Sequence, residues 1–248
     1  MFVWFFFLKP LVSFAQHSKN ISVENGLPSN SVRVLYKANN GLLWIGTDDG
    51  LCSYDGNEIK VYNQKNGLPS NEVWSIVEDE KGHLVLGCYN GGICFYDGNE
   101  FTSFTEKDGL PSNKVRQLYY KDSLLFIATD SKLTIYDGNK FYYKASMMQV
   151  MSINQVNQSI YAITRAMGVY KIDYDIHDLP NFRLDSCFWK GTLFGAASLK
   201  NGLLLLKNKE LNYLENDHFQ NCNISSKDFL SNSISWDACM TKDGSIYL

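Results

Sequence analysis

The sequence predicts an all-β fold, a β-propeller of four-stranded antiparallel blades, of which about five and a half are present. The prediction rests on two short sequence motifs that recur along the chain. Both return after about 40 residues, which is the length of one blade built from four short strands and tight turns. The first phrase, NGLPSN or DGLPSN, lies at Asn25–Asn30, Asn66–Asn71 and Asp108–Asn113, and the second, YDGN, starts at Tyr54, Tyr96 and Tyr136.

The first repeat contains four runs that fit strands, separated by turn residues. Asn and Gly occupy the first connection, Asp48, Asp49 and Gly50 the second, and Asp55, Gly56 and Asn57 the third. These residues favour tight turns between antiparallel strands. The expected strands are Val32–Tyr36, Leu42–Thr47, Leu51–Asp55 and Glu58–Tyr62.

The next two repeats follow the same plan, and the later ones are degenerate. The second repeat predicts strands at Val73–Val77, Leu84–Cys88, Ile93–Asp97 and Glu100–Thr105, and the third at Val115–Tyr119, Leu124–Thr129, Leu133–Asp137 and Lys140–Tyr143. A fourth blade is indicated by a hairpin of Tyr161–Thr164 with Gly168–Asp173, and a fifth by strands at Gly191–Ala196 and Leu203–Leu206. A sixth begins at Leu230 and reaches Tyr247. The clear repeats thus span 21–143 and the degenerate ones 144–248.

Residues 1–15 are predicted to be a signal peptide. The run MFVWFFFL at Met1–Leu8 is apolar but too short to span a bilayer, and Ser13 and Ala15 stand at −3 and −1 of a cut before Gln16. No Lys or Arg precedes the run, which departs from the usual pattern. The alternative is a buried first strand, which the lack of alternation disfavours.

Residues 16–248 are interpreted as the N-terminal part of a propeller. Ile21 precedes Gly26 as Tyr62 precedes Gly67, so the mature chain is expected to begin with a fourth strand. A propeller closed in this way needs a last blade that supplies the other three strands. Since that blade is missing from the sequence, we expect a longer protein.

Composition excludes some partners and leaves the cysteines ambiguous. The net charge is −3 and 45% of residues are hydrophobic, so a core is expected and a nucleic-acid surface is not. Cys52 and Cys94 occupy the same place in successive repeats and are expected to be buried, because equivalent positions of neighbouring blades are too far apart for a disulfide. Cys88 and Cys94 form the one local pair that could be bridged. No spacing indicates a metal, and no cofactor is expected.

Residues repeated in every unit are interpreted as scaffold, since each repeat must bury the same face. The glycines and prolines of GLPSN are expected to fix the turn between blades, and the asparagines to bond neighbouring backbone. Trp44 is expected to pack between blades and Asp55, Asp97 and Asp137 to form turns. An Asp ring that binds metal or sugar is the functional alternative.

Ligand-binding residues are sought where the repeats differ. First strands line the central channel of a propeller, and the residue after the opening Val varies from Arg to Trp. Arg offers forked donors and Trp a stacking face, which suit a carbohydrate or an anionic small molecule. Loops vary for many reasons, so ordinary solvated residues are the alternative. The candidates are Arg33, Trp74, Arg116, Tyr89 and Asn90.

The sequence offers no catalytic residue. GxSxG, HExxH and Walker motifs are missing, and the four His share no spacing. Carboxylates lie mostly in turns, so no glycosidase pair can be picked out.

The motif that starts with GLPSN, continues as LWIGT at Leu43–Thr47 and ends with YDG at Tyr54–Gly56 resembles the two-component regulator propeller repeat. The resemblance is strong over 21–143 and weak beyond. It implies the periplasmic sensor region of a hybrid two-component or sensor histidine kinase. It also implies seven-bladed propellers, followed by a membrane helix and by kinase and DNA-binding parts that lie outside these residues.

The leading hypothesis is therefore a periplasmic propeller, at the inner membrane of a Gram-negative bacterium, that detects an oligosaccharide and controls transcription of carbohydrate-use genes. A homodimer through the full-length receptor is expected, with membrane contact only through a downstream helix. The alternatives are a secreted propeller that binds a protein or glycan, and a propeller polysaccharide lyase or glycosidase, since fold does not fix function.

Overall fold

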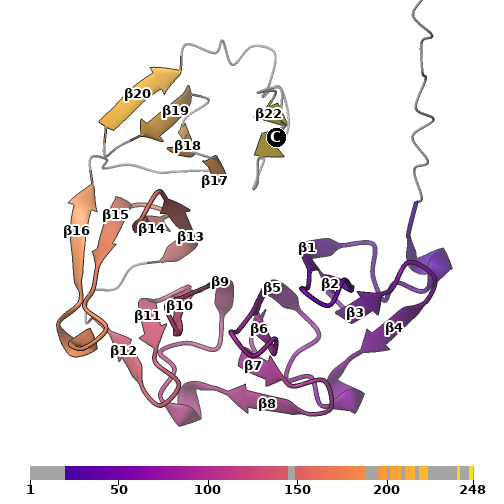
Figure 1. Cartoon of the computed structure of the whole chain (residues 1–248). Helices are drawn as coiled ribbons and strands as arrows, with labels where there is room; N and C mark the ends of the chain where they lie inside the picture. The colour runs from indigo at the N-terminus through magenta and orange to yellow at the C-terminus, as the bar shows by residue number, and fades with distance from the viewer. Residues whose placement is uncertain are drawn as a thin grey trace, which may run out of the picture.

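The first five repeats each fold into a four-stranded antiparallel sheet in a computed structural model, which confirms the predicted fold class. The structure describes residues 20–144 and 149–187, and beyond them strands within 195–247. Figure 1 shows the five four-stranded sheets fanned along an arc, with the first strand of each innermost and the fourth outermost. We call these sheets blades 1 to 5. The signal peptide predicted at residues 1–15 lies outside the described residues.

Blades 1 to 3 match the predicted strands to within one or two residues at each end. Each strand pairs with the next along the chain, so every blade is a simple meander. Blade 1 comprises β1 (Val32–Lys37), β2 (Leu43–Thr47), β3 (Gly50–Tyr54) and β4 (Ile59–Tyr62); blade 2 comprises β5 (Val73–Glu78), β6 (Leu84–Cys88), β7 (Gly92–Tyr96) and β8 (Phe101–Phe104); blade 3 comprises β9 (Val115–Lys121), β10 (Leu124–Thr129), β11 (Leu133–Tyr136) and β12 (Phe141–Tyr143).

The degenerate repeats form sheets of the same order. The predicted hairpin of the fourth repeat is confirmed. In the fifth repeat the predicted first strand, 191–196, overlaps β17, which continues to Leu199, so the end of the prediction is corrected, and 191–194 lie outside the described residues. Blade 4 comprises β13 (Val150–Val156), β14 (Ser159–Thr164), β15 (Gly168–Asp173) and β16 (Arg183–Cys187); blade 5 comprises β17 (Gly195–Leu199), β18 (Gly202–Lys207), β19 (Glu210–Glu215) and β20 (His218–Cys222); a hairpin of β21 (Cys239–Met240) and β22 (Ile246–Tyr247) follows.

The segments that lead into blades 1, 2 and 3 each contain a single 3₁₀ turn. These are η1 (Val23–Asn25), η2 (Gln64–Asn66) and η3 (Glu106–Asp108), each with a capping box and each ended by a glycine at φ 96–106°. That left-handed conformation suits glycine. The strand expected at Ile21 falls mostly outside the described residues, and Ile21 itself packs against a small core of blade 1.

The asparagine of GLPSN ties each of these turns to the following strand. The Oδ1 atoms of Asn30, Asn71 and Asn113 accept hydrogen bonds from the backbone N–H groups of Val23, Gln64 and Glu106 at 2.8–3.0 Å. The expected backbone role of these asparagines is thus confirmed. Since the N–H that each one satisfies belongs to the start of the 3₁₀ turn, the motif fixes how one blade leads into the next.

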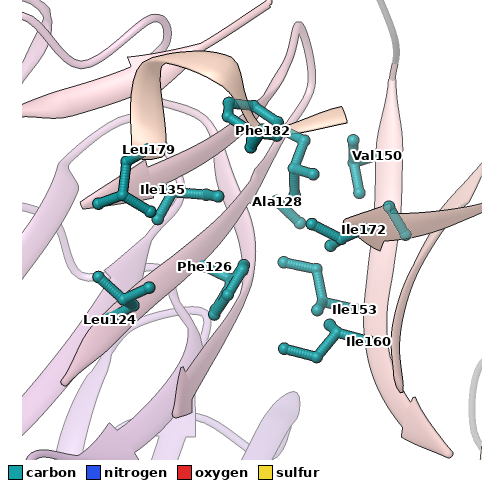
Figure 2. Close-up of a cluster of buried hydrophobic side chains, with 12 residues drawn as sticks. Leu124, Phe126, Ala128, Ile135, Val150, Ile153, Ile160, Ile172, Leu179 and Phe182 are labelled. Carbon is teal, nitrogen blue, oxygen red and sulfur yellow. The ribbon is translucent and has the colours of Figure 1, made fainter. Parts of the chain in front are cut away.

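The core lies between neighbouring blades. Trp44 of blade 1 is 4% exposed and contacts Tyr62 of its own blade and Tyr96 of blade 2, with ring centroids 5.6 and 5.9 Å apart. This confirms its packing role. Figure 2 shows the corresponding cluster of blades 3 and 4, where Phe126 and Ile135 lie opposite Ile153 and Ile160.

One face of blade 1 differs from the same face of its neighbours. Ile76 and Leu118, which pack against the preceding blade, are each 3% exposed. Leu35 holds the same place on β1 and is 62% exposed. Within the described part of the chain, therefore, β1 lacks the packing partner that β5 and β9 have.

The aspartates of YDG form the turn between the third and fourth strands, as predicted. Asp97 Oδ1 accepts from the backbone N–H groups of Asn99 and Glu100 at 2.8 and 2.9 Å, and Asp55 and Asp137 do the same in their blades. The Glu100 and Asn99 amides hold the pKa of Asp97 below its usual range.

We expect the stability of the protein to fall in acid partly because of Asp97. A carboxyl whose folded pKa is lowered stabilises the fold above its unfolded pKa of about 3.9, and that contribution is lost as pH falls through the folded pKa. Urea unfolding between pH 7 and pH 3 measures it. In Asp97→Asn the amide oxygen can still accept both bonds but does not titrate, so its stability should fall less steeply below pH 5. Equal slopes would contradict this role.

Candidate functional site

The first strand of each of blades 1 to 4 has a β-bulge at the residue after its opening Val. In blade 1, Val32 pairs with Thr47 and Val34 with Gly46, which leaves Arg33 as the extra residue. The pairing shifts at the same place in the next three blades. A bulge twists the strand and redirects its side chain. The four bulge residues are Arg33, Trp74, Arg116 and Met151.

These four bulge residues line one cavity. It has a volume of about 400 Å³, and Val32 completes the described lining. Cavities of this size hold small organic ligands. Since each blade contributes the residue at the same position, the chemistry of the cavity is set by one variable residue per repeat while the scaffold stays constant.

The Trp74 ring contacts Tyr89 and both arginines of the bulge positions. Trp74 stacks on Tyr89, from the turn between β6 and β7, with centroids 4.3 Å apart and planes 10° from parallel. The Arg33 guanidinium lies 5.1 Å from the Trp74 ring centroid, and the Arg116 guanidinium lies 5.7 Å from it and 5.8 Å from that of Tyr89. These distances allow cation–π attraction.

Arg33 is neutralised by an aspartate of its own blade. Its Nε and Nη2 atoms donate to the two carboxylate oxygens of Asp48 at 2.5 and 2.7 Å, a bidentate pair. The hydrogen bond raises the pKa of Arg33 and lowers that of Asp48, and the charge of Glu72 adds to the effect on Arg33. The pair therefore fixes the position of Arg33 and leaves little net charge there.

Arg116 has no such partner in the described part of the chain. Among the described residues it makes no hydrogen bond or ion pair, and its Nε atom is enclosed without an acceptor, as is Nε1 of Trp74. The neighbouring acid, Asp130, accepts instead from Ser112 Oγ at 2.7 Å and lies 3.7 Å from Lys114 Nζ. Arg116 thus brings an unpaired positive charge to the cavity.

A family model described as "Two component regulator propeller" matches residues 26–49 and 67–90. These segments start in the GLPSN motif, pass through the first and second strands of blades 1 and 2, and end in the following turn. They are two-component regulator propeller repeats. The resemblance predicted from sequence is thereby confirmed for the first two units, and no curated protein matches the chain.

Several solved structures share the fold of this chain. The chain superposes on the extracellular domain of BT4673 from B. thetaiotaomicron, described as a one-component system, with a TM-score of 0.67 and 15% identity over 89% of this chain and 33% of that one. On the extracellular domain of BT3049, described as a hybrid two-component system of the same organism, it superposes with a TM-score of 0.55 and 21% identity, over 78% of this chain and 28% of that one. On the computationally designed protein Ika8 it superposes with a TM-score of 0.61 and 12% identity, over 86% of this chain and 66% of that one.

At these identities the likeness establishes the propeller fold. The chain spans about a third of the length of the two B. thetaiotaomicron domains. What those proteins do is therefore a matter for proposal in this one.

The two-component regulator propeller repeat leaves the bulge position free to vary. Its GLPSN and YDG residues make the turns described above, whereas Arg33 and Trp74 differ between two repeats that match the family. Of the five predicted site residues, the structure brings together Arg33, Trp74, Arg116 and Tyr89. Their role in binding a ligand stays a prediction.

Asn90, the fifth candidate, has a different place. It is exposed in the turn between β6 and β7 at φ 65°, a left-handed conformation that Asn tolerates better than most residues. It does not belong to the described lining of the cavity. A conformational role explains its presence in that turn.

Met151 was missed by sequence reasoning. It lies in a degenerate repeat that no GLPSN introduces, and Met suggests a core residue. The sequence does hold a signal that could have found it: Val150–Ile153 spells VMSI and Val73–Ile76 spells VWSI. Aligning the two places Met151 opposite Trp74.

Other candidate chemistry in the described residues is sparse. No group of three or more His, Cys, Asp or Glu could hold a metal ion there. Cys52, Cys88 and Cys94 are buried free thiols, so the local pair Cys88 and Cys94 is not bridged. Burial raises the pKa of Cys52 and of Cys94 to about 11. No helix in this part of the chain has the length and apolar character to cross a membrane.

Proposed function

We propose that this chain is the ligand-sensing propeller of a membrane sensor histidine kinase, exported to the periplasm. The observation that carries the proposal is the ring of bulge residues around one cavity. A scaffold that repeats while one inward position per blade changes is suited to recognise a ligand. The family of the repeats supports the signalling context, in which the ligand favours one arrangement of paired receptors.

The ligand we propose is an oligosaccharide whose recognition controls transcription of carbohydrate-use genes. Trp74 offers an aromatic surface, Arg116 offers guanidinium donors, and Val32 and Met151 offer apolar contact. Sugars present hydroxyl groups and apolar C–H faces, which these groups complement. The described lining holds no carboxylate or imidazole, so we propose binding without chemical conversion.

Trp74→Ala should weaken oligosaccharide binding by about tenfold or more, because an aromatic anchor carries much of the energy of such a site. The measurement is isothermal titration of the full-length receptor with oligosaccharides released from plant and host polysaccharides. The control is Tyr143→Ala, which removes an exposed aromatic ring from the outer strand of blade 3. Unchanged binding in Trp74→Ala would count against the cavity as the ligand site.

A further inference from the structure

Three basic residues of blades 1 to 3 lie at or beside the cavity, Arg33, Lys114 and Arg116, and two of them have an acidic neighbour among the described residues. Asp48 and Glu72 act on Arg33, and Asp130 lies 3.7 Å from Lys114. Arg116 remains without an acid. A guanidinium in a partly enclosed site gains from a bound oxyanion, because its forked donors match two oxygens of a carboxylate or sulfate.

Arg116 is also held in place before any ligand arrives. Its guanidinium lies against the Trp74 and Tyr89 rings, which stack on each other. Such packing reduces the rotamer freedom that a long side chain would lose on binding. Arg33, by contrast, has both carboxylate oxygens of Asp48 on its donors and is best regarded as a positioning residue for Trp74.

We propose that the cavity selects an acidic ligand, in which Arg116 binds one carboxylate or sulfate group. This rests on the proposed function and narrows it to acidic saccharides. The oxyanion lies at the blade 3 side of the cavity, against Arg116. The ligand's uncharged body lies toward Val32 and Met151, the apolar members of the lining. A simple stacking role of Arg116 on the two rings is the competing explanation, and it predicts no preference for charge.

Matched pairs of probes separate these explanations. The full-length protein is titrated with digalacturonate and its uncharged methyl diester, and with N-acetylglucosamine 6-sulfate and N-acetylglucosamine. Citrate serves as an acid that is not a sugar. We expect one acidic sugar to bind about tenfold to a hundredfold more tightly than its neutral partner, the usual range for a charged hydrogen bond. Which pair shows the preference distinguishes carboxylate from sulfate.

Arg116→Gln should remove that preference, and Arg116→Lys should keep part of it, because Lys retains the charge without the fork. Arg183→Gln is the matched control, since it changes the net charge equally at an exposed position on β16, the outermost strand of blade 4, and should leave binding unchanged. A second test uses the wild-type protein alone and so does not depend on whether a variant folds. At higher salt concentration the acidic sugar should bind more weakly, whereas the affinity for the neutral sugar should not change.

Three outcomes decide the matter. A neutral sugar that binds as tightly as its acidic partner would overturn the acidic selectivity and leave the sensing proposal standing. Binding of citrate alone, lost in Arg116→Gln, would support the oxyanion role and overturn the saccharide. If Arg116→Gln still prefers the acidic sugar to the same degree, a group other than Arg116 binds the carboxylate or sulfate, and the proposed role of Arg116 is wrong.

Discussion

Gly92→Ala is expected to lower the free energy of unfolding by about 3 kcal/mol or more. Gly92 opens β7 at φ 75°, where a side chain is strained. A Cβ atom there would lie 2.2 Å from the carbonyl oxygen of Phe104 on the neighbouring strand. Because the obstructing atom belongs to the backbone, the strand pair itself must move. Chemical denaturation of the full chain measures the loss.

Gly98→Ala separates the two contributions to that loss. Gly98, in the YDG turn, also has positive φ, at 102°, but no atom lies within 4 Å of the position that a Cβ would take there. Only the conformational strain applies, so the expected loss is about 1 kcal/mol. If the two variants were equally stable, the close approach of β7 and β8 at Gly92 would not constrain the fold.

The roles of the scaffold could be predicted because each depends on local chemistry. Gly67 needs no neighbour to favour positive φ, and Asn71 and Asp97 bond backbone groups within seven residues of themselves. A residue of this kind has the same consequence wherever the repeat occurs. Three copies of one phrase therefore determine the turns and, through them, the meander of each blade.

The bulge could not be predicted, since it depends on pairing between strands. Val32, Arg33 and Val34 alternate in hydrophobicity like an ordinary strand, and only the shifted partners Thr47 and Gly46 reveal the extra residue. The same limit affects the fifth blade. Its apolar residues give no turn motif to set the boundary, so the predicted strand ends at 196 whereas β17 continues to Leu199.

For a related reason, the sequence could predict some residues of the candidate site but not how they interact. Choosing variable positions identifies Arg33, Trp74 and Arg116, because scaffold residues repeat and ligand contacts do not need to. Sequence variability alone does not show that Arg33 is paired with an acid and Arg116 is not, among the described residues. Their difference comes from Asp48, 15 residues away from Arg33, which reaches the one arginine and not the other.

Phe126→Ala is expected to cost about 3–5 kcal/mol of stability. Phe126 lies on β10, is fully buried, and belongs to the cluster that joins blades 3 and 4; Figure 2 shows it facing Ile153 across the two sheets. Removing the ring leaves a cavity between blades. The free energy from urea unfolding of the full chain is the measurement.

Two further variants show whether the interface between blades is the cause. Phe126→Leu keeps most of the apolar volume and should cost less than about 1.5 kcal/mol. Leu35→Ala removes a side chain from the open face of β1, where 62% exposure leaves little to lose, so a change within about 0.5 kcal/mol is expected. Apart from a few hydrogen bonds such as that from the Ile153 N–H to Gln117 Oε1, blades 3 and 4 meet through such apolar side chains. A small effect of Phe126→Ala would therefore mean that the apolar cluster does not couple the unfolding of the two blades.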